Sequence, residues 1–192
     1  MWHNYHTTNV YGLKANISML YSFGKTQFGA EIRREEILSS NLGEVLSDSV
    51  KVKGRNAWYT NGGERNLSNL FASQTFYLKR VTLSGGLQLA YNSSFSYIWC
   101  WGADISYSPN NHSRFFASAN RSYRVPTFTD LYYSSPTNVG NPNLKPELAT
   151  TIEGGLKTNR KAWSMQLAAF YRQGSNIIDW VKEPTDEAWH TI

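Results

Sequence analysis

The feature that most constrains this sequence is the alternation of apolar and polar side chains. The alternation is clear in five segments: 11–21, 81–91, 97–107, 148–156 and 163–171. It is weaker in three more: 26–38, 67–79 and 113–124. A repeat of two residues indicates a β-strand with one apolar face, whereas an amphipathic helix repeats about every 3.6 residues. The sequence therefore predicts about eight strands and no helix.

The connections between these expected strands differ from one end of the strands to the other. Every second connection is a short turn, at residues 22–25, 79–80, 109–112 and 158–160. Two of the three alternate connections are long, at residues 39–65 and 125–146, and the third, at 92–94, is modest. Outer-membrane barrels combine short turns on one side with longer loops on the other. The order of strands and loops therefore predicts an antiparallel meander.

The two faces of the predicted strands carry different chemistry. Tyr11 and Tyr21 share one face ten residues apart, as do Tyr97 and Tyr107. Ten residues of strand extend about 33 Å, and a tilt of about 40° reduces this to the roughly 25 Å of an apolar membrane band. The opposite face is polar, with Lys14, Asn16, Gln88, Asp104, Arg114, Asn120, Glu153 and Gln166. We expect lipid on one side and a wet interior on the other, because a dry core could not hold these groups without partners. The alternative is a soluble β-sandwich binding module with these residues in solvent.

Composition narrows the possible functions. No run approaches the roughly 20 apolar residues of a membrane helix, and the single cysteine, Cys100, excludes a disulfide scaffold. The 19 basic and 14 acidic residues give a net charge of +5, but the basic residues form no run, so we expect no nucleic-acid partner. No catalytic triad spacing, carboxylate pair, metal motif or phosphate-binding loop is present. We therefore expect neither an enzyme nor a metal or cofactor site.

A proline-rich, aromatic segment interrupts the alternation at residues 123–147, YRVPTFTDLYYSSPTNVGNPNLKPE. Proline cannot donate a ladder hydrogen bond, and it forces the preceding residue into an extended conformation. We expect a stiff, non-pairing loop at the long-loop end, with the strand pattern resuming at Glu147. Preorganised aromatic side chains lose little freedom on binding. The candidate ligand contacts are therefore the loop aromatics Trp58, Tyr59, Tyr132, Tyr133 and Trp180, for which membrane anchoring or loop self-packing is the alternative role.

Several motifs in this region resemble one family. Residues 124–127 (RVPT), 130–132 (DLY) and 140–147 (GNPNLKPE) closely resemble the late-barrel signature of TonB-dependent outer-membrane receptors. Residues 153–157, 169–171 and 177–180 fit as well, and residues 62–66 (GGERN) fit more weakly. The form of residues 127–133 (TFTDLYY) is most similar to the cobalamin-receptor branch. The resemblance covers roughly residues 10–190.

The resemblance implies a function beyond what the pattern shows. It implies a 22-stranded barrel of the bacterial outer membrane, closed by a plug domain and importing a scarce nutrient with energy from TonB. We expect an all-β fold in which residues 1–192 form a single piece of this larger transmembrane β-barrel, without the plug through which the TonB complex acts. The expected small-molecule partner is cobalamin-like, with an iron chelate (siderophore) as the alternative. A complete small eight-stranded barrel with a structural or adhesive role is a further alternative.

Overall fold

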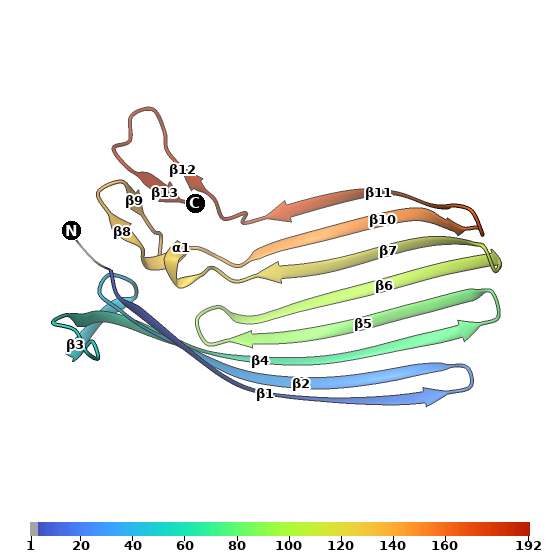
Figure 1. Cartoon of the computed structure of the whole chain (residues 1–192), viewed down its shortest axis with the longest axis horizontal. Coiled ribbons are helices and arrows are strands. Elements are labelled where there is room, and N and C mark those ends of the chain that lie inside the picture. Colours follow the sequence, from blue (N-terminus) through green and yellow to red (C-terminus); the bar gives the residue numbers. More distant parts are fainter. Residues whose placement is uncertain (1–3) are drawn as a thin grey trace.

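The computed structural model describes residues 4–192 and consists almost wholly of β-strands (Figure 1). The strands of the main sheet are β1 (His6–Tyr21), β2 (Gly24–Ser39), β3 (Glu44–Lys51), β4 (Trp58–Leu78), β5 (Val81–Asn92), β6 (Ser96–Asn110), β7 (Ser113–Arg124), β10 (Glu147–Asn159) and β11 (Ser164–Ser175). The remaining elements are α1 (Phe128–Tyr132), β8 (Ser134–Ser135), β9 (Asn138–Val139), β12 (Trp180–Val181) and β13 (Trp189–Thr191).

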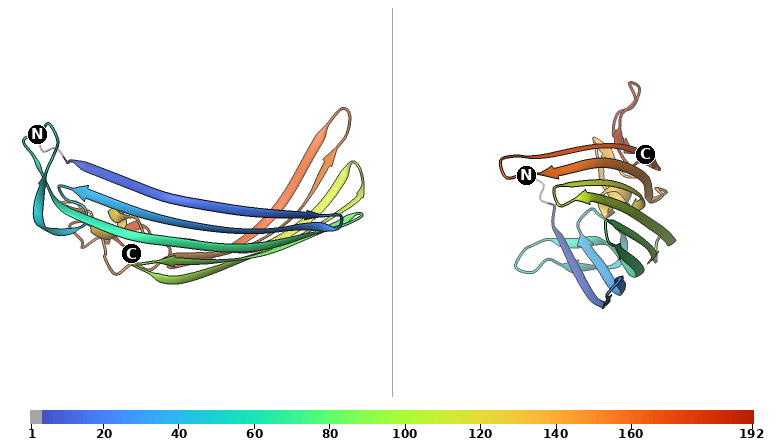
Figure 2. Two further views of the ribbon diagram at one scale, coloured as in Figure 1. Left: turned by 90° about the horizontal axis from the view of Figure 1, so that it is seen from below. Right: turned by 90° about the vertical axis from the view of Figure 1, so that its right-hand side faces the viewer.

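Eight long strands pair side by side in chain order, β1-β2-β4-β5-β6-β7-β10-β11, and every pairing is antiparallel. The sheet curves along its length and across its width, as a section of a barrel wall does (Figure 2). This confirms the predicted antiparallel meander, including the start of β10 at Glu147. β1 and β11 are the outermost strands. No helix among residues 4–192 is long and apolar enough to cross a membrane.

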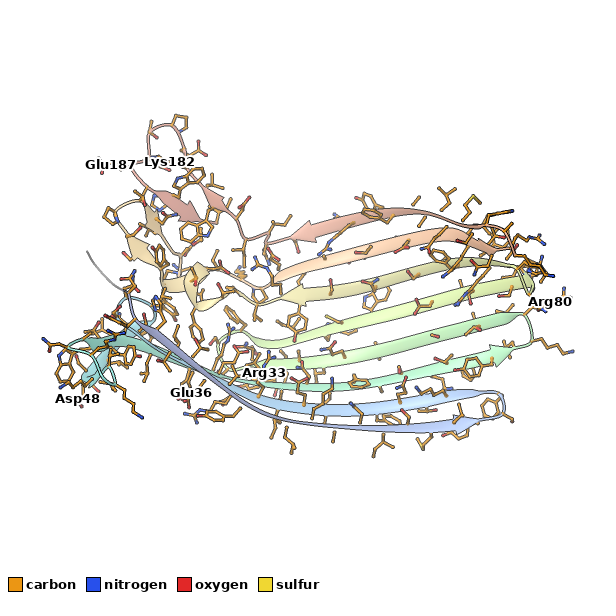
Figure 3. All side chains as sticks on the ribbon, viewed as in Figure 1. Arg33, Glu36, Asp48, Arg80, Lys182 and Glu187 are labelled. Atoms are coloured by element: carbon orange, nitrogen blue, oxygen red, sulfur yellow. The ribbon has the colours of Figure 1, made fainter. Side chains whose placement is uncertain are left out.

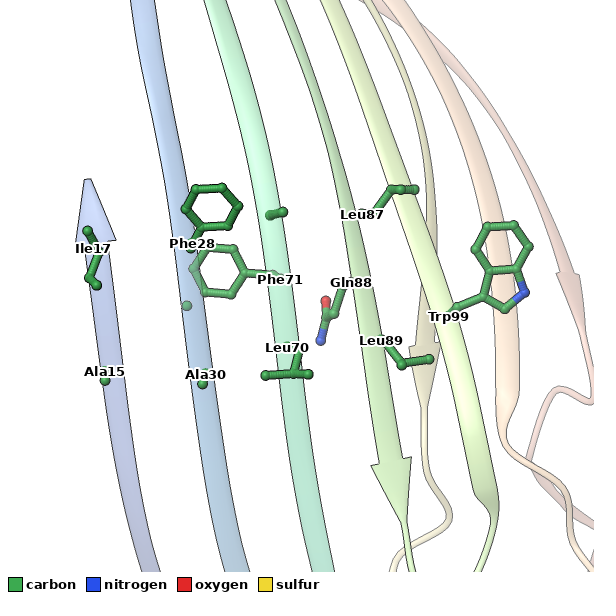
Figure 4. A pocket seen from close by; sticks show the side chains of 12 residues that line it. Ala15, Ile17, Phe28, Ala30, Leu70, Phe71, Leu87, Gln88, Leu89 and Trp99 are labelled. Atoms are coloured by element: carbon green, nitrogen blue, oxygen red, sulfur yellow. The ribbon is translucent and has the colours of Figure 1, made fainter. Parts of the chain in front are cut away.

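One face of this sheet is apolar and exposed. The register places Ile17 of β1 beside Phe28 of β2, Phe28 beside Ala72, Ala72 beside Leu87 of β5, and Leu87 beside Trp101 of β6. Ile17 is 65% exposed and Leu87 is 59% exposed. Ala72 of this row, with Ala15 and Ala30 of the neighbouring row, leaves a shallow groove of about 710 Å³ between the larger side chains (Figure 4). So wide an apolar surface is unsuited to water and suited to lipid.

The opposite, concave face is polar along most of its length. Asp104, Arg114, Glu153 and Gln166 line a cavity of about 300 Å³ on this face. Near the long-loop end the same face holds a small apolar core, in which Tyr123, Val125 and Leu148 pack against Ala90, Ile98 and Cys100. β7 leaves β6 beyond the Gly102–Asn120 pair, and its end contacts this face: the Tyr123 hydroxyl donates a hydrogen bond to Asn69 of β4, at 3.2 Å.

The charged segment 33–36 belongs to strand β2. Arg34 binds Glu36 at 2.7 Å and Glu64 of β4 at 2.5 Å, while Arg33 lies 3.1 Å from Glu35. The apolar alternation thus ends where β2 passes beyond the apolar band, and ion pairs within β2 and between β2 and β4 replace it.

The long-loop end is more ordered than the sequence predicted. Residues 39–65 are not one loop, because β3 pairs with the beginning of β4, which starts at Trp58 and not near residue 67. The proline-rich segment is not free of pairing either, since it contains α1 and the β8–β9 hairpin. β9 joins β13, and the four short strands form a second sheet in the order β12-β13-β9-β8. The predictions of one loop at residues 39–65 and of a non-pairing proline-rich segment were both wrong for the same reason. The strands that pair in these regions are short and lack alternation of apolar and polar residues.

Candidate functional site at the long-loop end

Arg124 and Glu147 join the two strands between which the proline-rich loop emerges. They are directly opposite each other on β7 and β10, and Arg124 donates from Nε and Nη2 to the two carboxylate oxygens at 2.7 and 2.9 Å. The Glu147 carboxylate also accepts from the backbone N–H of Ile178, at 2.7 Å. A bidentate pair of this kind is stronger than a single charged contact. It holds the base of loop 125–146 against the segment that follows β11.

The hydrogen bonds from Arg124, supported by the Ile178 N–H, lower the pKa of Glu147 from 4.5 to about 2. The same pairing with Glu147 raises the pKa of Arg124. Since the folded pKa of Glu147 is depressed, its stabilising effect is complete above pH 4.5 and is lost as the pH falls towards 2.

We expect acidification from pH 4.5 to about 2 to loosen the packing of the two loops, because protonated Glu147 accepts weaker hydrogen bonds. Near-UV circular dichroism of the loop aromatics would follow the change. Glu147→Gln is the control: its signal should already be altered at neutral pH and should lack this acid transition. An identical transition in wild type and Glu147→Gln would contradict the assignment.

The short helix α1 is fixed at its beginning by a capping box. The Thr127 hydroxyl accepts from the N–H of Asp130 at 3.1 Å, and the Asp130 carboxylate accepts from the N–H of Thr127 at 2.8 Å. These two contacts satisfy backbone donors that a helix start otherwise leaves unpaired. The Asp130 carbonyl accepts from the hydroxyl of Thr191, which is buried in β13, at 2.8 Å. Helix α1 is therefore the point where the proline-rich loop and the C-terminal short strands meet.

Arg65 reaches the same loop from β4. Its Nε donates to Glu35 of β2 at 2.6 Å and its Nη1 to the carbonyl of Pro126 at 2.7 Å. The guanidinium carbon lies 4.8 Å from the centre of the Phe128 ring, a cation–π contact. Arg65 is only 8% exposed. The buried guanidinium of Arg65 thus connects strands β2 and β4 to the beginning of α1. This contact is possible because the β5–β6 hairpin between them is shorter.

A cavity of about 600 Å³ opens between α1, β3 and β4. Its apolar and aromatic lining includes Leu46, Phe128, Leu131 and Tyr132, and its polar lining includes Glu44. Burial, and second the negative charge of the nearby Glu44 carboxylate, raise the pKa of Tyr132. The lining also includes the charged residues Glu36, Glu64 and Arg65, so the cavity is mixed in polarity. Its volume lies in the range of small-molecule sites.

The structure brings three of the five predicted ligand contacts to this region. Tyr132 lines the cavity. Tyr133 and Trp180 pack edge to face with ring centres 6.4 Å apart, although 46 positions separate them in the sequence.

The other two predicted contacts lie apart from this cluster. Trp58 is half exposed at the beginning of β4, opposite Lys51 of β3. The Tyr59 hydroxyl is hydrogen-bonded to Thr7 of β1 at 2.7 Å. These contacts do not bring either residue to α1, and ligand binding by all five remains a prediction.

Sequence reasoning did not assign roles to the charged residues that organise this region. Arg65, Arg124, Asp130 and Glu147 were seen only as parts of motifs. The Thr127–Asp130 spacing was a usable signal, since a capping box places a hydroxyl residue three positions before an acidic or amide residue. The pairing of Arg65 with Pro126 had no such signal, because it depends on how β4 passes the β5–β6 hairpin.

An open antiparallel sheet with one lipid-suited face, a polar concave face and long loops at one end defines a section of an outer-membrane barrel. Residues 2–189 match the family described as TonB dependent receptor-like, beta-barrel. The chain therefore belongs to the TonB-dependent receptors, proteins of the bacterial outer membrane that act as transporters and not as enzymes.

Two curated relatives are both named Vitamin B12 transporter BtuB. The protein from Vibrio vulnificus is 26% identical over 142 residues, which cover 74% of this chain and 23% of that protein. The protein from Photobacterium profundum is 22% identical over 170 residues, which cover 83% of this chain and 28% of that protein. The chain thus spans about a quarter of the length of these relatives.

Solved structures share the fold at lower identity. The siderophore receptor PirA from Pseudomonas aeruginosa superposes with a TM-score of 0.76 at 21% identity, over 97% of this chain and 34% of that one. The copper transporter OprC superposes with a TM-score of 0.77 at 13% identity, over 98% and 34% of the two chains. At these identities the likeness shows the fold alone.

Proposed function

We propose that residues 1–192 form wall and outer loops of a longer receptor that binds a scarce nutrient outside the cell and imports it with energy from TonB. A plug domain in another part of the receptor would close the barrel and contact the TonB complex. The observation that carries the proposal is the joining of the outer connections. Arg65, the Arg124–Glu147 pair and the short-strand sheet hold them together around an aromatic surface and a 600 Å³ cavity.

The nutrient that this proposal favours is cobalamin-like. Both curated relatives carry the name of vitamin B12 transporters, and their matches cover most of this chain. A ferric siderophore is the second candidate, since siderophore receptors such as PirA are among the proteins that share this fold. Direct titration of the full-length receptor with cyanocobalamin and with ferric enterobactin distinguishes the two. Binding of neither ligand would contradict both assignments.

Replacing Trp180 by Ala in the full-length receptor is expected to weaken binding of the nutrient by about 2 kcal/mol, roughly thirtyfold in Kd. The reason is that Trp180 and Tyr133 form a preorganised aromatic pair at the outer surface. Isothermal titration calorimetry with the ligand identified above gives the value. Trp163→Ala is a matched control, since Trp163 is 53% exposed beside the short β10–β11 turn at the opposite end. Equal affinity of Trp180→Ala and wild type would remove this pair from the binding surface.

A further inference from the structure

The short-turn end of the sheet carries basic residues without any acidic ones. It comprises residues 19–28, 75–84, 105–116 and 155–166, the four hairpins that connect β1 to β2, β4 to β5, β6 to β7 and β10 to β11. Seven of the 19 lysines and arginines lie in these ranges, and none of the 14 acidic residues does. In the sequence these basic residues are scattered, and only the meander collects them at one end.

Four of these cations lie in the turns. Lys79 and Arg80 form the β4–β5 turn, and Arg160 and Lys161 lie in the β10–β11 turn. All four residues are exposed, and Figure 3 shows Arg80 at the tip of this end. Four strand spacings of about 4.8 Å separate those turns, so the cations span about 19 Å of the rim. We call these four residues the basic rim.

The basic rim has no acidic partner among residues 4–192. Every ion pair among the described residues involves an acidic residue that lies away from the four hairpins. These acidic residues are Glu31, Glu35, Glu36, Glu64, Asp130 and Glu147. Unpaired like charges on neighbouring turns repel one another, and an external anion relieves that repulsion.

Aromatic side chains lie immediately inside the basic rim. Tyr21 stacks on Phe23 with ring centres 5.4 Å apart, and Tyr107 pairs with Phe115 across β6 and β7. Trp163 follows Lys161 by two residues. Aromatic rings prefer the boundary between hydrocarbon and headgroups. Cations one or two residues farther out then lie at the depth of the lipid phosphates.

From this order of apolar band, aromatic ring and cation we propose that the basic rim binds the phosphate headgroups of anionic phospholipids in the leaflet on the short-turn side. In outer-membrane barrels that side is periplasmic. The inference rests on the proposed placement of the chain in an outer-membrane barrel, and it is independent of the transported nutrient. Each cation near an anionic surface contributes about fivefold to binding. The basic rim would hold the sheet at a fixed depth in the bilayer, and the outer loops at the opposite end would bind the nutrient.

The test uses the full-length receptor in detergent micelles and fluorescent phosphatidylglycerol as the probe. The rim variant combines Lys79→Gln, Arg80→Gln, Arg160→Gln and Lys161→Gln. The matched control removes the same charge from exposed positions at the other end, with Lys51→Gln, Lys53→Gln, Arg55→Gln and Lys182→Gln. We expect the rim variant to bind the probe roughly tenfold more weakly or worse, the control to bind it as wild type does, and added salt to narrow the difference.

Three results would overturn the inference: unchanged affinity of the rim variant, an equal loss in the control, or a wild-type preference for lipid A or for peptidoglycan fragments over phosphatidylglycerol. Nutrient binding measured on the same samples separates this proposal from the proposed function. A receptor that retains phosphatidylglycerol through the rim but binds no nutrient refutes only the nutrient assignment. A receptor that binds nutrient equally in all three forms, with lipid affinity unchanged, refutes only the basic rim.

Discussion

Replacing Leu87 by Arg is expected to destabilise folding of the full-length receptor into a bilayer by about 2–4 kcal/mol. Leu87 lies within β5 on the exposed apolar face, between Ala72 and Trp101 of the adjacent strands. A guanidinium at this position would have to enter the hydrocarbon of the bilayer or bring water molecules into it. Urea titration of the receptor folded into lipid vesicles, followed by tryptophan fluorescence, measures the change.

The next residue along the strand provides the control. Gln88 lies on the concave face, where it donates a hydrogen bond to Asn69 at 3.3 Å, so Gln88→Arg adds the same side chain to the wet side. We expect a loss of less than about 1 kcal/mol there. If the two variants lost equal stability, or if Gln88→Arg lost more, the assignment of lipid and water to the two faces would be reversed or wrong.

Replacing Arg65 by Met is expected to cost about 3–5 kcal/mol of folding free energy, because it leaves a largely buried carboxylate without its main partner. The Arg65 and Glu35 side chains are 10% and 14% exposed. The same change removes the donor to the Pro126 carbonyl. Loop 125–146 should therefore also become more sensitive to protease, which limited proteolysis would detect.

Arg34→Met is the matched control. Arg34 also binds two glutamates, but its side chain is 48% exposed, and exposed pairs contribute only about 0–1 kcal/mol. The double variant Arg65→Met with Glu35→Leu should recover part of the loss, since it removes both buried charges. Equal losses for Arg65→Met and Arg34→Met, or no recovery in the double variant, would mean that burial does not strengthen the Arg65 pair.

The eight long strands could be predicted because the signal for them is local. Alternation within a dozen residues suffices to place β5 or β6, and the register follows from the short turns between them. The same signal fails for β3, whose sequence EVLSDSVK is too polar to alternate and whose pairing with β4 contains an irregularity between Val45 and Val50. It fails also for β8, β9, β12 and β13, which have only two or three residues each.

The candidate site was predicted as a set of aromatic side chains, and the residues that arrange them were not. The pairing of Tyr133 with Trp180 follows from β9 lying beside β13, a contact between segments about fifty positions apart. The exception is Thr127 with Asp130, whose local spacing already indicates a helix start. Contacts between residues that are close in the sequence can be predicted from local patterns. Contacts between loops depend on the shape of the sheet that carries the loops.

The outermost strands of the sheet have a consequence for how such a wall is assembled. Within residues 4–192, β1 pairs only with β2 and β11 only with β10, so a line of peptide N–H and C=O groups points away from each side of the sheet. Every such group left bare in hydrocarbon costs several kcal/mol, and together they outweigh what the apolar face gains there. Neighbouring strands must therefore dock on both flanks before or during entry into the membrane, which makes completion of the cylinder a condition of its insertion.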